Sequence, residues 1–182
     1  MLTFAVGSVR GCASQLANLL EQCHVYAGHQ SARYVFLGNF INQGPDSRGV
    51  VEKIIDLQNN SGNRVIALAG ENETLLREWE IGDNMPRWLN RGGGATLRSY
   101  AVFSPADLPQ DHLTWLKSLN HSFHDQLRYF AAAGLKADSI SRAVIVINNR
   151  QTRQARPIAQ SQSNINLDTG AGFGGPVMAA VG

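Results

Sequence analysis

Carboxamide side chains gather in one short loop that follows an apolar segment. Residues 34–37 read Tyr-Val-Phe-Leu, and the glycine-bounded loop at residues 38–44 holds Asn39, Asn42 and Gln43. Polar loops at the carboxyl ends of strands are where open α/β sheets place their ligand sites. A carboxamide is neutral, so it can neither balance a metal cation nor hold a phosphate as an arginine does. The loop therefore has the position of a ligand site without strong chemistry of its own.

Two other loops have the same form. Ser8 and Arg10 follow one apolar segment, and Glu71 and Asn72 follow another. Each loop leads into a segment whose apolar residues recur at helical spacing. The three strands are expected at residues 2–6, 34–37 and 64–68. Successive strand–loop–helix units favour parallel strands, so we expect the three loops to converge at one edge of a sheet.

The chain after His121 has a β pattern with short connections, which favours hairpins. Residues 151–163 are polar and without periodicity, and we expect an exposed loop there. The glycine-rich run at residues 170–175 lies between two expected strands and predicts a hairpin rather than a phosphate cradle. The strands are expected at residues 127–133, 143–147, 165–167 and 176–180. With no internal repeat and no linker, residues 1–182 are expected to form a single domain.

Several stretches follow one another in an order that resembles the calcineurin-like metallophosphoesterases. The matching stretches are residues 44–51, Gly92-Gly93 with 95–97 and 99–100, residues 133–135, and 166–171 with Gly174-Gly175. The nearest branch is the bacterial phosphoprotein phosphatase and diadenosine tetraphosphatase group. The resemblance covers nearly the whole chain. It implies an α/β fold, namely a four-layer α/β/β/α sandwich of two facing mixed sheets.

That resemblance also implies a metal site whose ligands are replaced here. The family holds two divalent cations, such as Mn, Fe or Zn, about 3.5–4 Å apart, which generate a hydroxide and clamp the phosphate. Its motifs place aspartate, histidine, asparagine and arginine at positions that we call the motif positions. In this chain they are Ser8, Arg10, Asn39, Asn42, Gln43, Glu71, Asn72, Ala132 and Asn148. Shortening of the segment before Asn148 also removes the stretch that carries a substrate-binding arginine in the family.

The charges of the replacing residues favour a site without metal. Ser8, Asn39 and Asn42 are neutral where the family has carboxylates, and carboxylates left without metals would repel one another. Arg10 and Glu71 add one charge of each sign, so we expect them to pair and to fill part of the metal space. A second interpretation is that Arg10 contacts an anion such as phosphate directly. We expect no metal cofactor and no catalytic residue.

None of the five histidines falls on a motif position. His121 and His124 are three residues apart on an expected strand, so their side chains face opposite sides and are expected at the surface rather than on a metal. His24 and His29 flank a loop and are expected to be solvated, and His112 begins a polar helix.

The two cysteines, Cys12 and Cys23, are eleven residues apart on the helix expected at residues 12–23. At about 1.5 Å of rise per residue they are roughly 16 Å apart, beyond the reach of a disulfide. We expect two buried thiols, as in a reducing, cytoplasmic compartment.

The composition excludes several classes of partner. A formal net charge of +2 with no run of basic residues does not favour nucleic acid or a membrane surface. The hydrophobic content of 43% is that of a globular protein, and the first residues enter a strand without the pattern of a signal peptide. We therefore expect a cytoplasmic protein.

The leading hypothesis is a catalytically inactive phosphatase-like protein, or pseudophosphatase, that acts by binding a protein partner or in regulation. One alternative is a metal-free sensor of a phosphorylated small molecule or nucleotide. Another is a residual phosphoesterase, of the serine/threonine phosphatase or dinucleoside polyphosphate hydrolase type, with an altered mechanism. The sequence names no partner and leaves a homo-oligomer open.

Overall fold

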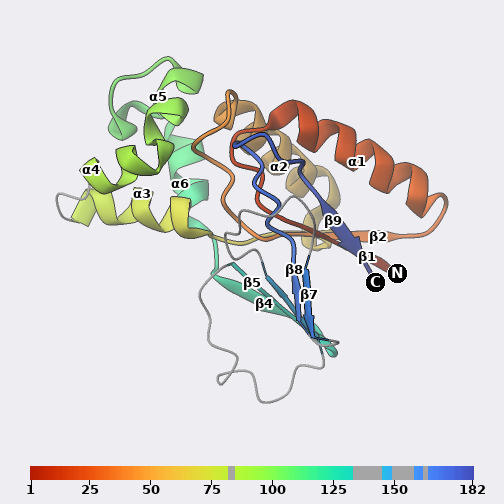
Figure 1. The fold of residues 1–182 in the computed structure, drawn as a ribbon. Helices are drawn as coiled ribbons and strands as arrows, with labels where there is room; N and C mark the ends of the chain where they lie inside the picture. Colours follow the sequence, from red (N-terminus) through yellow and green to blue (C-terminus); the bar gives the residue numbers. More distant parts are fainter. Residues whose placement is uncertain (82–84, 133–144, 149–157, 162–163) are drawn as a thin grey trace.

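Two β-sheets lie face to face, with helices on one side and at one end (Figure 1). The structure is a computed structural model that describes residues 1–81, 85–132, 145–148, 158–161 and 164–182. The first sheet has the strand order β3-β2-β1-β9 and the second has the order β4-β5-β6-β8-β7. Both sheets mix parallel and antiparallel neighbours, so the expected α/β fold with two facing mixed sheets is confirmed.

The first sheet carries the three strands that precede the polar loops. Its strands are β1 (Leu2–Val6), β2 (Ala32–Phe36), β3 (Val65–Ala67) and β9 (Ala179–Val181). β1, β2 and β3 run parallel, as the three strand–loop–helix units predicted, and β9 pairs antiparallel with β1. The parallel order brings the loops after β1, β2 and β3 to one edge of the sheet.

The second sheet contains both hairpin-like and parallel pairs. Its strands are β4 (Ser122–His124), β5 (Arg128–Ala131), β6 (Ile145–Asn148), β7 (Ile158–Ser161) and β8 (Asn164–Asn166). The antiparallel pairs β4–β5 and β7–β8 agree with the expected hairpins, but β6 pairs parallel with both β5 and β8. The expectation of a loop through residues 151–163 was wrong where β7 forms.

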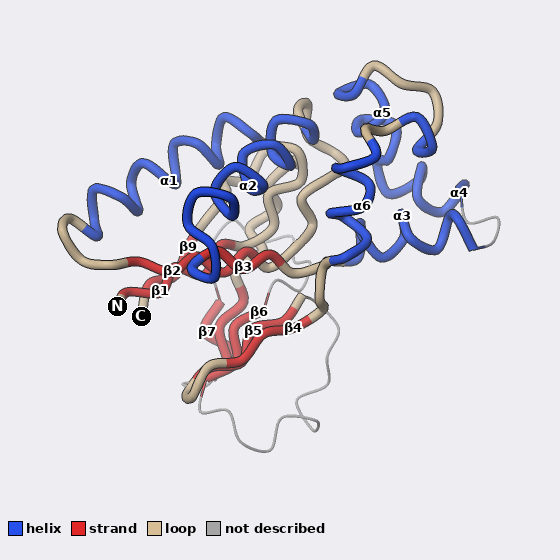
Figure 2. Tube along the Cα trace, turned by 180° about the vertical axis from the view of Figure 1, so that it is seen from behind, coloured by secondary structure: helices blue, strands red, loops and turns tan. Residues whose placement is uncertain are grey.

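Six helices are described, and they form two groups. The longer helices α1 (Ala13–Ala27) and α2 (Ser47–Ser61) cover the outer face of the first sheet (Figures 1 and 2). The others lie together beyond the end of that sheet; they are α3 (Glu71–Ile81), α4 (Met85–Trp88), α5 (Gly94–Tyr100) and α6 (Gln110–Ser118). The short helical turn η1 (Gly62–Arg64) links α2 to β3, whereas η2 (Leu89–Gly93) links α4 to α5 and η3 (Pro105–Asp107) lies between α5 and α6. Within the described ranges no helix covers the outer face of the second sheet.

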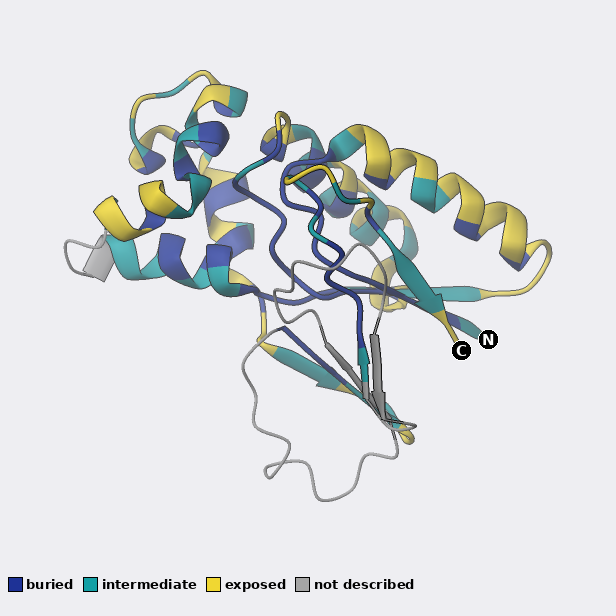
Figure 3. Cartoon of the chain, in the orientation of Figure 1, coloured by how far each residue is buried: buried dark blue, intermediate teal, exposed yellow. Residues whose placement is uncertain are grey.

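Alternation along the strands builds two apolar layers. In β2, Val35 and the following Leu37 face the second sheet and pack with Phe130 and Leu167, whereas Phe36 faces the helices. In Figure 3 the buried residues accordingly lie in the interior of the molecule. The two layers fix both sheets relative to the helices, and so they fix the strand ends from which the loops emerge.

The glycine-rich run at residues 170–175 is a crossing between sheets. It leaves β8 of the second sheet and leads toward β9 of the first, so the expected hairpin was wrong. This crossing passes the motif positions, because a Cβ at Gly172 would lie 3.1 Å from Cβ of Arg10. None of the described helices is both long enough and apolar enough to cross a membrane.

Candidate functional site

A buried carboxylate holds the loop after β2 in place. The two oxygens of Glu73 accept hydrogen bonds from the backbone N–H groups of Asn39, Phe40, Ile41 and Gly70, at distances of 2.8–3.3 Å. Burial raises the pKa of Glu73, and these four hydrogen bonds oppose that rise. Glu73 therefore ties the loop after β2 to the start of α3.

The backbone of the loops is unusual at the motif positions themselves. Among the described residues, five non-glycine residues have positive φ, and four of them are Arg10, Asn39, Asn42 and Gln43. Asparagine tolerates this left-handed conformation, but arginine and glutamine enter it at a cost. The loops thus hold a left-handed backbone at four of the motif positions, two of which carry residue types that disfavour it.

Ser8, Asn39 and Asn72 meet in one buried network, one residue from each of the three loops. Asn39 Nδ2 donates to Ser8 Oγ at 3.3 Å, and Asn39 Oδ1 accepts from the backbone N–H of Asn72 at 3.1 Å. Asn72 Nδ2 donates to the carbonyl oxygen of Ile41 at 2.8 Å. The expected convergence of the loops is confirmed, and these carboxamides bond to the backbone and to the hydroxyl of Ser8.

Arg10 pairs with Asp168 and not with Glu71. Arg10 Nη2 lies 2.5 Å from Asp168 Oδ2, and the two side chains are 3% and 0% exposed. Asp168 follows β8, so this ion pair joins the two sheets. Burial raises the pKa of Asp168, while Arg10 opposes the rise. The expected Arg10–Glu71 pair was wrong, because Glu71 lies at the start of α3 and pairs with Arg91 at 2.7 Å.

Asn42 is fixed by Thr96 of α5. The Oγ1 of Thr96 accepts from the backbone N–H of Asn42 at 2.9 Å and donates to Asn42 Oδ1 at 3.0 Å. Asn42 is fully buried, and its Nδ2 has no hydrogen-bond partner among the described residues. Gln43 is partly buried; its Nε2 donates to the carbonyl oxygen of Arg91, and its Oε1 accepts from Asn72 Nδ2 at 3.4 Å.

The remaining motif positions lie on the second sheet. Ala132 is buried directly after β5, and Asn148 ends β6. In the strand register Asn148 pairs with Ala131 and with Asn166, so both positions lie at the same edge as the start of the segment that carries Asp168. The stretch 133–135 that also carried the resemblance is outside the described residues.

Of the histidines and cysteines, Cys12 borders this site, because its Sγ donates to the carbonyl oxygen of Arg10 at 3.7 Å. His24, His29, His121 and His124 are exposed, as expected. His112 is buried, and its Nδ1 lies 3.0 Å from the hydroxyl of Tyr100, so the buried ring has a hydrogen-bond partner. Both cysteines are buried and free, and burial raises the pKa of each thiol.

The residues at the motif positions do not fit a pair of divalent cations. The guanidinium of Arg10 brings a positive charge into the site, and it already neutralises Asp168. The two buried side-chain atoms that lack partners at the described motif positions are Arg10 Nη1 and Asn42 Nδ2, and both are hydrogen-bond donors. A metal ion needs acceptors. Within the described ranges no group of three or more His, Cys, Asp or Glu residues could hold a metal ion.

Sequence reasoning missed three residues that hold the site together. Thr96 and Asp168 lie in stretches that matched the family pattern, and Glu73 directly follows the motif position Asn72, but none of the three is a motif position. A buried acid can be recognised from sequence only when its partner is known, and Asp168 is 158 residues from Arg10. The signal in the sequence that could have pointed to Asp168 was the match of residues 166–171 to the family pattern.

Comparison with known proteins gives partial sequence matches and matches of the whole fold. The symmetrical bis(5'-nucleosyl)-tetraphosphatase of Bordetella pertussis is 33% identical over 73 residues, which are 40% of this chain and 24% of that protein. The enzyme of the same name from Janthinobacterium sp. is 35% identical over 76 residues, 42% of this chain and 26% of that protein. The matches thus span about a quarter of these relatives. No family model matches the chain.

Solved structures extend the similarity over the whole chain. A putative diadenosine tetraphosphatase has a TM-score of 0.70 at 21% identity, covering 99% of this chain and 88% of that one. A metallophosphoesterase from Sphaerobacter thermophilus has a TM-score of 0.55 at 18% identity, covering 86% and 61%. A cold-active protein tyrosine phosphatase has a TM-score of 0.73 at 13% identity, covering 99% and 73%. The chain therefore has the fold of the calcineurin-like metallophosphoesterase superfamily, and its partial sequence similarity is to the symmetrical tetraphosphatases.

Proposed function

We propose that this protein is a pseudophosphatase that binds no catalytic metal pair and acts through a protein partner. The observation that carries the proposal is the buried ion pair between Arg10 and Asp168. It puts a fixed positive charge at the motif position where the family has a metal-binding histidine. Two divalent ions placed beside this guanidinium would be repelled by it. The neutral residues Ser8, Asn39 and Asn42 supply no charge that would offset the repulsion.

The burial of the motif positions supports the same proposal. Ser8, Arg10, Asn39 and Asn72 are each at most 5% exposed, and Asn42 is fully buried. Phe173 lies over the guanidinium of Arg10, with 5.3 Å between Arg10 Cζ and the ring centroid. A phosphoester would have to displace these contacts to approach the loops. This favours a role for the outer surface of the protein over a role for the former active site.

Turnover is the test of this proposal. We expect hydrolysis of a chromogenic phosphodiester and of diadenosine tetraphosphate to stay at the buffer rate when manganese is present, because the described motif positions hold no residue pair that could activate a water or act as a nucleophile with its base. A metallophosphoesterase of the same fold, assayed in parallel, controls for the substrates. Metal-dependent turnover that stays with the protein through purification and disappears in the Arg10→Glu variant would contradict the proposal. It would favour the alternative that the protein is a residual phosphoesterase.

A second candidate function is a metal-free sensor of a phosphorylated small molecule. The orphaned donors Arg10 Nη1 and Asn42 Nδ2 favour it, because buried N–H groups gain free energy from an acceptor such as a phosphate oxygen. Thermal denaturation with inorganic phosphate and with nucleotides separates the two candidates. A ligand at about 100 times its dissociation constant stabilises a protein by about 2.7 kcal/mol. Stabilisation of this size that is lost in Arg10→Met would favour the sensor.

A further inference from the structure

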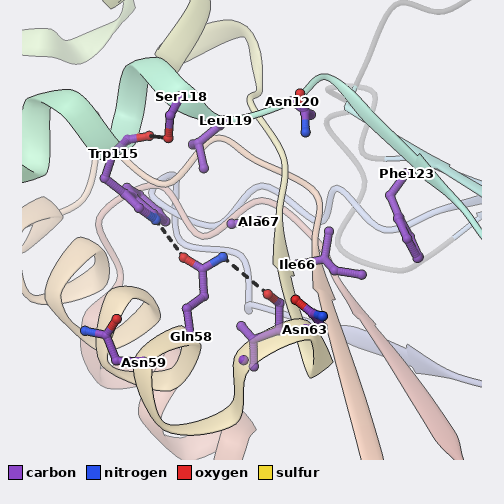
Figure 4. Close-up of a pocket in the computed structure, with 12 residues that line it drawn as sticks. Gln58, Asn59, Asn63, Ile66, Ala67, Trp115, Ser118, Leu119, Asn120 and Phe123 are labelled. Atoms are coloured by element: carbon purple, nitrogen blue, oxygen red, sulfur yellow. Dashed lines mark hydrogen bonds between the residues drawn. The ribbon is translucent and has the colours of Figure 1, made fainter.

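A pocket away from the motif positions lies where the two sheets meet the helices (Figure 4). Its volume is about 580 Å³, and it lies between the end of α2, the edge strand β3, the end of α6 and β4. The polar lining includes four carboxamides, and the apolar lining includes two aromatic rings. These side chains are Gln58, Asn59, Asn63, Asn120, Trp115 and Phe123. The volume is within the range of ligand sites.

The lining carries no charge. None of the described residues that line the pocket is an Asp, Glu, Lys, Arg or His, and the guanidinium of Arg33 lies over the ring of Phe123, with 5.7 Å between Arg33 Cζ and the ring centroid. A phosphate, a carboxylate or an ammonium group would lose water there without gaining a partner of opposite charge. A carboxamide, in contrast, offers one acceptor oxygen and two N–H donors, which is the hydrogen-bonding pattern of a peptide group. The pocket thus suits an uncharged ligand that has peptide groups.

Two of the lining side chains are already held in position. Trp115 Nε1 donates to Gln58 Oε1 at 2.7 Å, and Gln58 Nε2 donates to the carbonyl oxygen of Val65 at 3.2 Å (Figure 4). The indole also packs against Phe40, with 5.6 Å between the ring centroids. Fixed aromatic rings bind a partner at a low cost in conformational entropy.

The edge of the first sheet supplies one backbone group to the same pocket. Ala67 pairs with Phe36 of β2, and Phe36 accepts its hydrogen bond from the N–H of Leu68. The N–H of Ala67 therefore points away from β2, toward the pocket that Ala67 lines. At Val65 the outward groups are taken by Gly62 and Gln58. The edge can thus make a single backbone contact, which is too few for the addition of a whole strand.

We propose that this pocket binds a short, uncharged, extended segment of a partner protein. The carboxamides of Asn59, Asn63 and Asn120 would bond to the peptide groups of that segment, the N–H of Ala67 would bond to one of its carbonyl oxygens, and Trp115 would pack against an apolar side chain. The inference rests on the proposed function, because it names the class of partner that a pseudophosphatase with this surface would bind.

The test begins with a phage-displayed library of random 12-residue peptides, selected on the whole wild-type protein. We expect the enriched peptides to share an uncharged core. In the double variant Asn63→Asp with Asn120→Asp, the affinity of these peptides should fall roughly tenfold or more, since two NH₂ groups are lost and two negative charges are gained. Both residues are exposed, so the variant should fold normally. Asn18→Asp on the exposed face of α1 is the matched control and should leave the affinity unchanged.

A second measurement locates the bound peptide. In a ¹H–¹⁵N spectrum the indole N–H of Trp115 and the amide of Ala67 should shift on addition of a selected peptide, and an N-methylated version of the core should bind weakly. Peptides that bind wild type and the double variant alike would overturn the proposal. So would a shift of these two signals by adenosine or glucose but by no peptide, because the pocket would then take a small neutral molecule. Neither outcome depends on phosphatase activity, so failure here is distinct from failure of the proposed function.

Discussion

Arg10→Met is expected to lower the free energy of unfolding by about 3–5 kcal/mol, because it leaves Asp168 as a buried carboxylate without its counter-charge. Chemical denaturation of the wild type and of the variant measures the loss. Arg48→Met is the control, since Arg48 and Glu52 form an exposed pair at 2.8 Å whose loss should change the stability little. Equal effects of the two substitutions would contradict a structural role for the buried pair.

The pH dependence of the Arg10→Met variant gives a second readout. Without the guanidinium, the pKa of Asp168 should rise further in the folded state, because burial raises it already. A carboxyl group whose pKa is raised on folding is stabilising below its unfolded pKa, and that stability is lost as the pH rises through the folded pKa. The loss of unfolding free energy relative to the wild type should therefore be smaller near about pH 5 than near about pH 8. Adding Asp168→Asn to Arg10→Met should recover part of the stability by removing the charge.

Glu73→Gln is expected to cost about 2–6 kcal/mol, because the new NH₂ group faces two backbone N–H donors that then lack an acceptor, at about 1–3 kcal/mol each. The affected donors are either those of Phe40 and Ile41 or those of Asn39 and Gly70. Glu21→Gln, on an exposed position of α1, is the matched control and should change the stability little. Thermal denaturation of both variants measures the effect.

Amide hydrogen exchange tests the mechanism of the Glu73→Gln loss. Because Glu73 ties the loop after β2 to the start of α3, exchange should speed up first at Asn39–Ile41 and Gly70. If the variant were destabilised with exchange increased evenly across the described strands instead, the local role assigned to Glu73 would be wrong.

The sequence allowed the loops to be placed but not their partners. The positions after β1, β2 and β3 followed from apolar periodicity and from glycines such as Gly38, where a Cβ would clash with the backbone of Gly70. These are local properties that each segment carries by itself. The partner of Arg10 was not predictable, because Glu71 and Asp168 were equally available acids and only the packing of the second sheet selects Asp168.

Contacts between distant segments also explain the surroundings of His112 and the path of the glycine-rich run, which the sequence did not predict. His112 lies in the first turn of a helix, as expected, and the hydroxyl of Tyr100, 12 residues away in the chain, gives its buried ring a partner that the sequence did not predict. Residues 170–175 lie between two strands in sequence, and only the assembly of two sheets makes them a crossing. The pocket beside β3 was not foreseen either, because its carboxamides come from α2, η1 and the segment after α6. In each case a contact between segments far apart in the sequence determines the observed structure.

Titration of the purified protein with manganese tests the central proposal most directly. If Arg10 and the neutral motif positions have replaced the metal pair, isothermal calorimetry should give no saturable binding, and the metal content after gel filtration should be far below one equivalent. Prior treatment with a chelator, followed by the same titration, controls for metal retained from expression. Binding of two equivalents of manganese with a dissociation constant in about the micromolar range, corresponding to about −8 kcal/mol, would contradict the proposal.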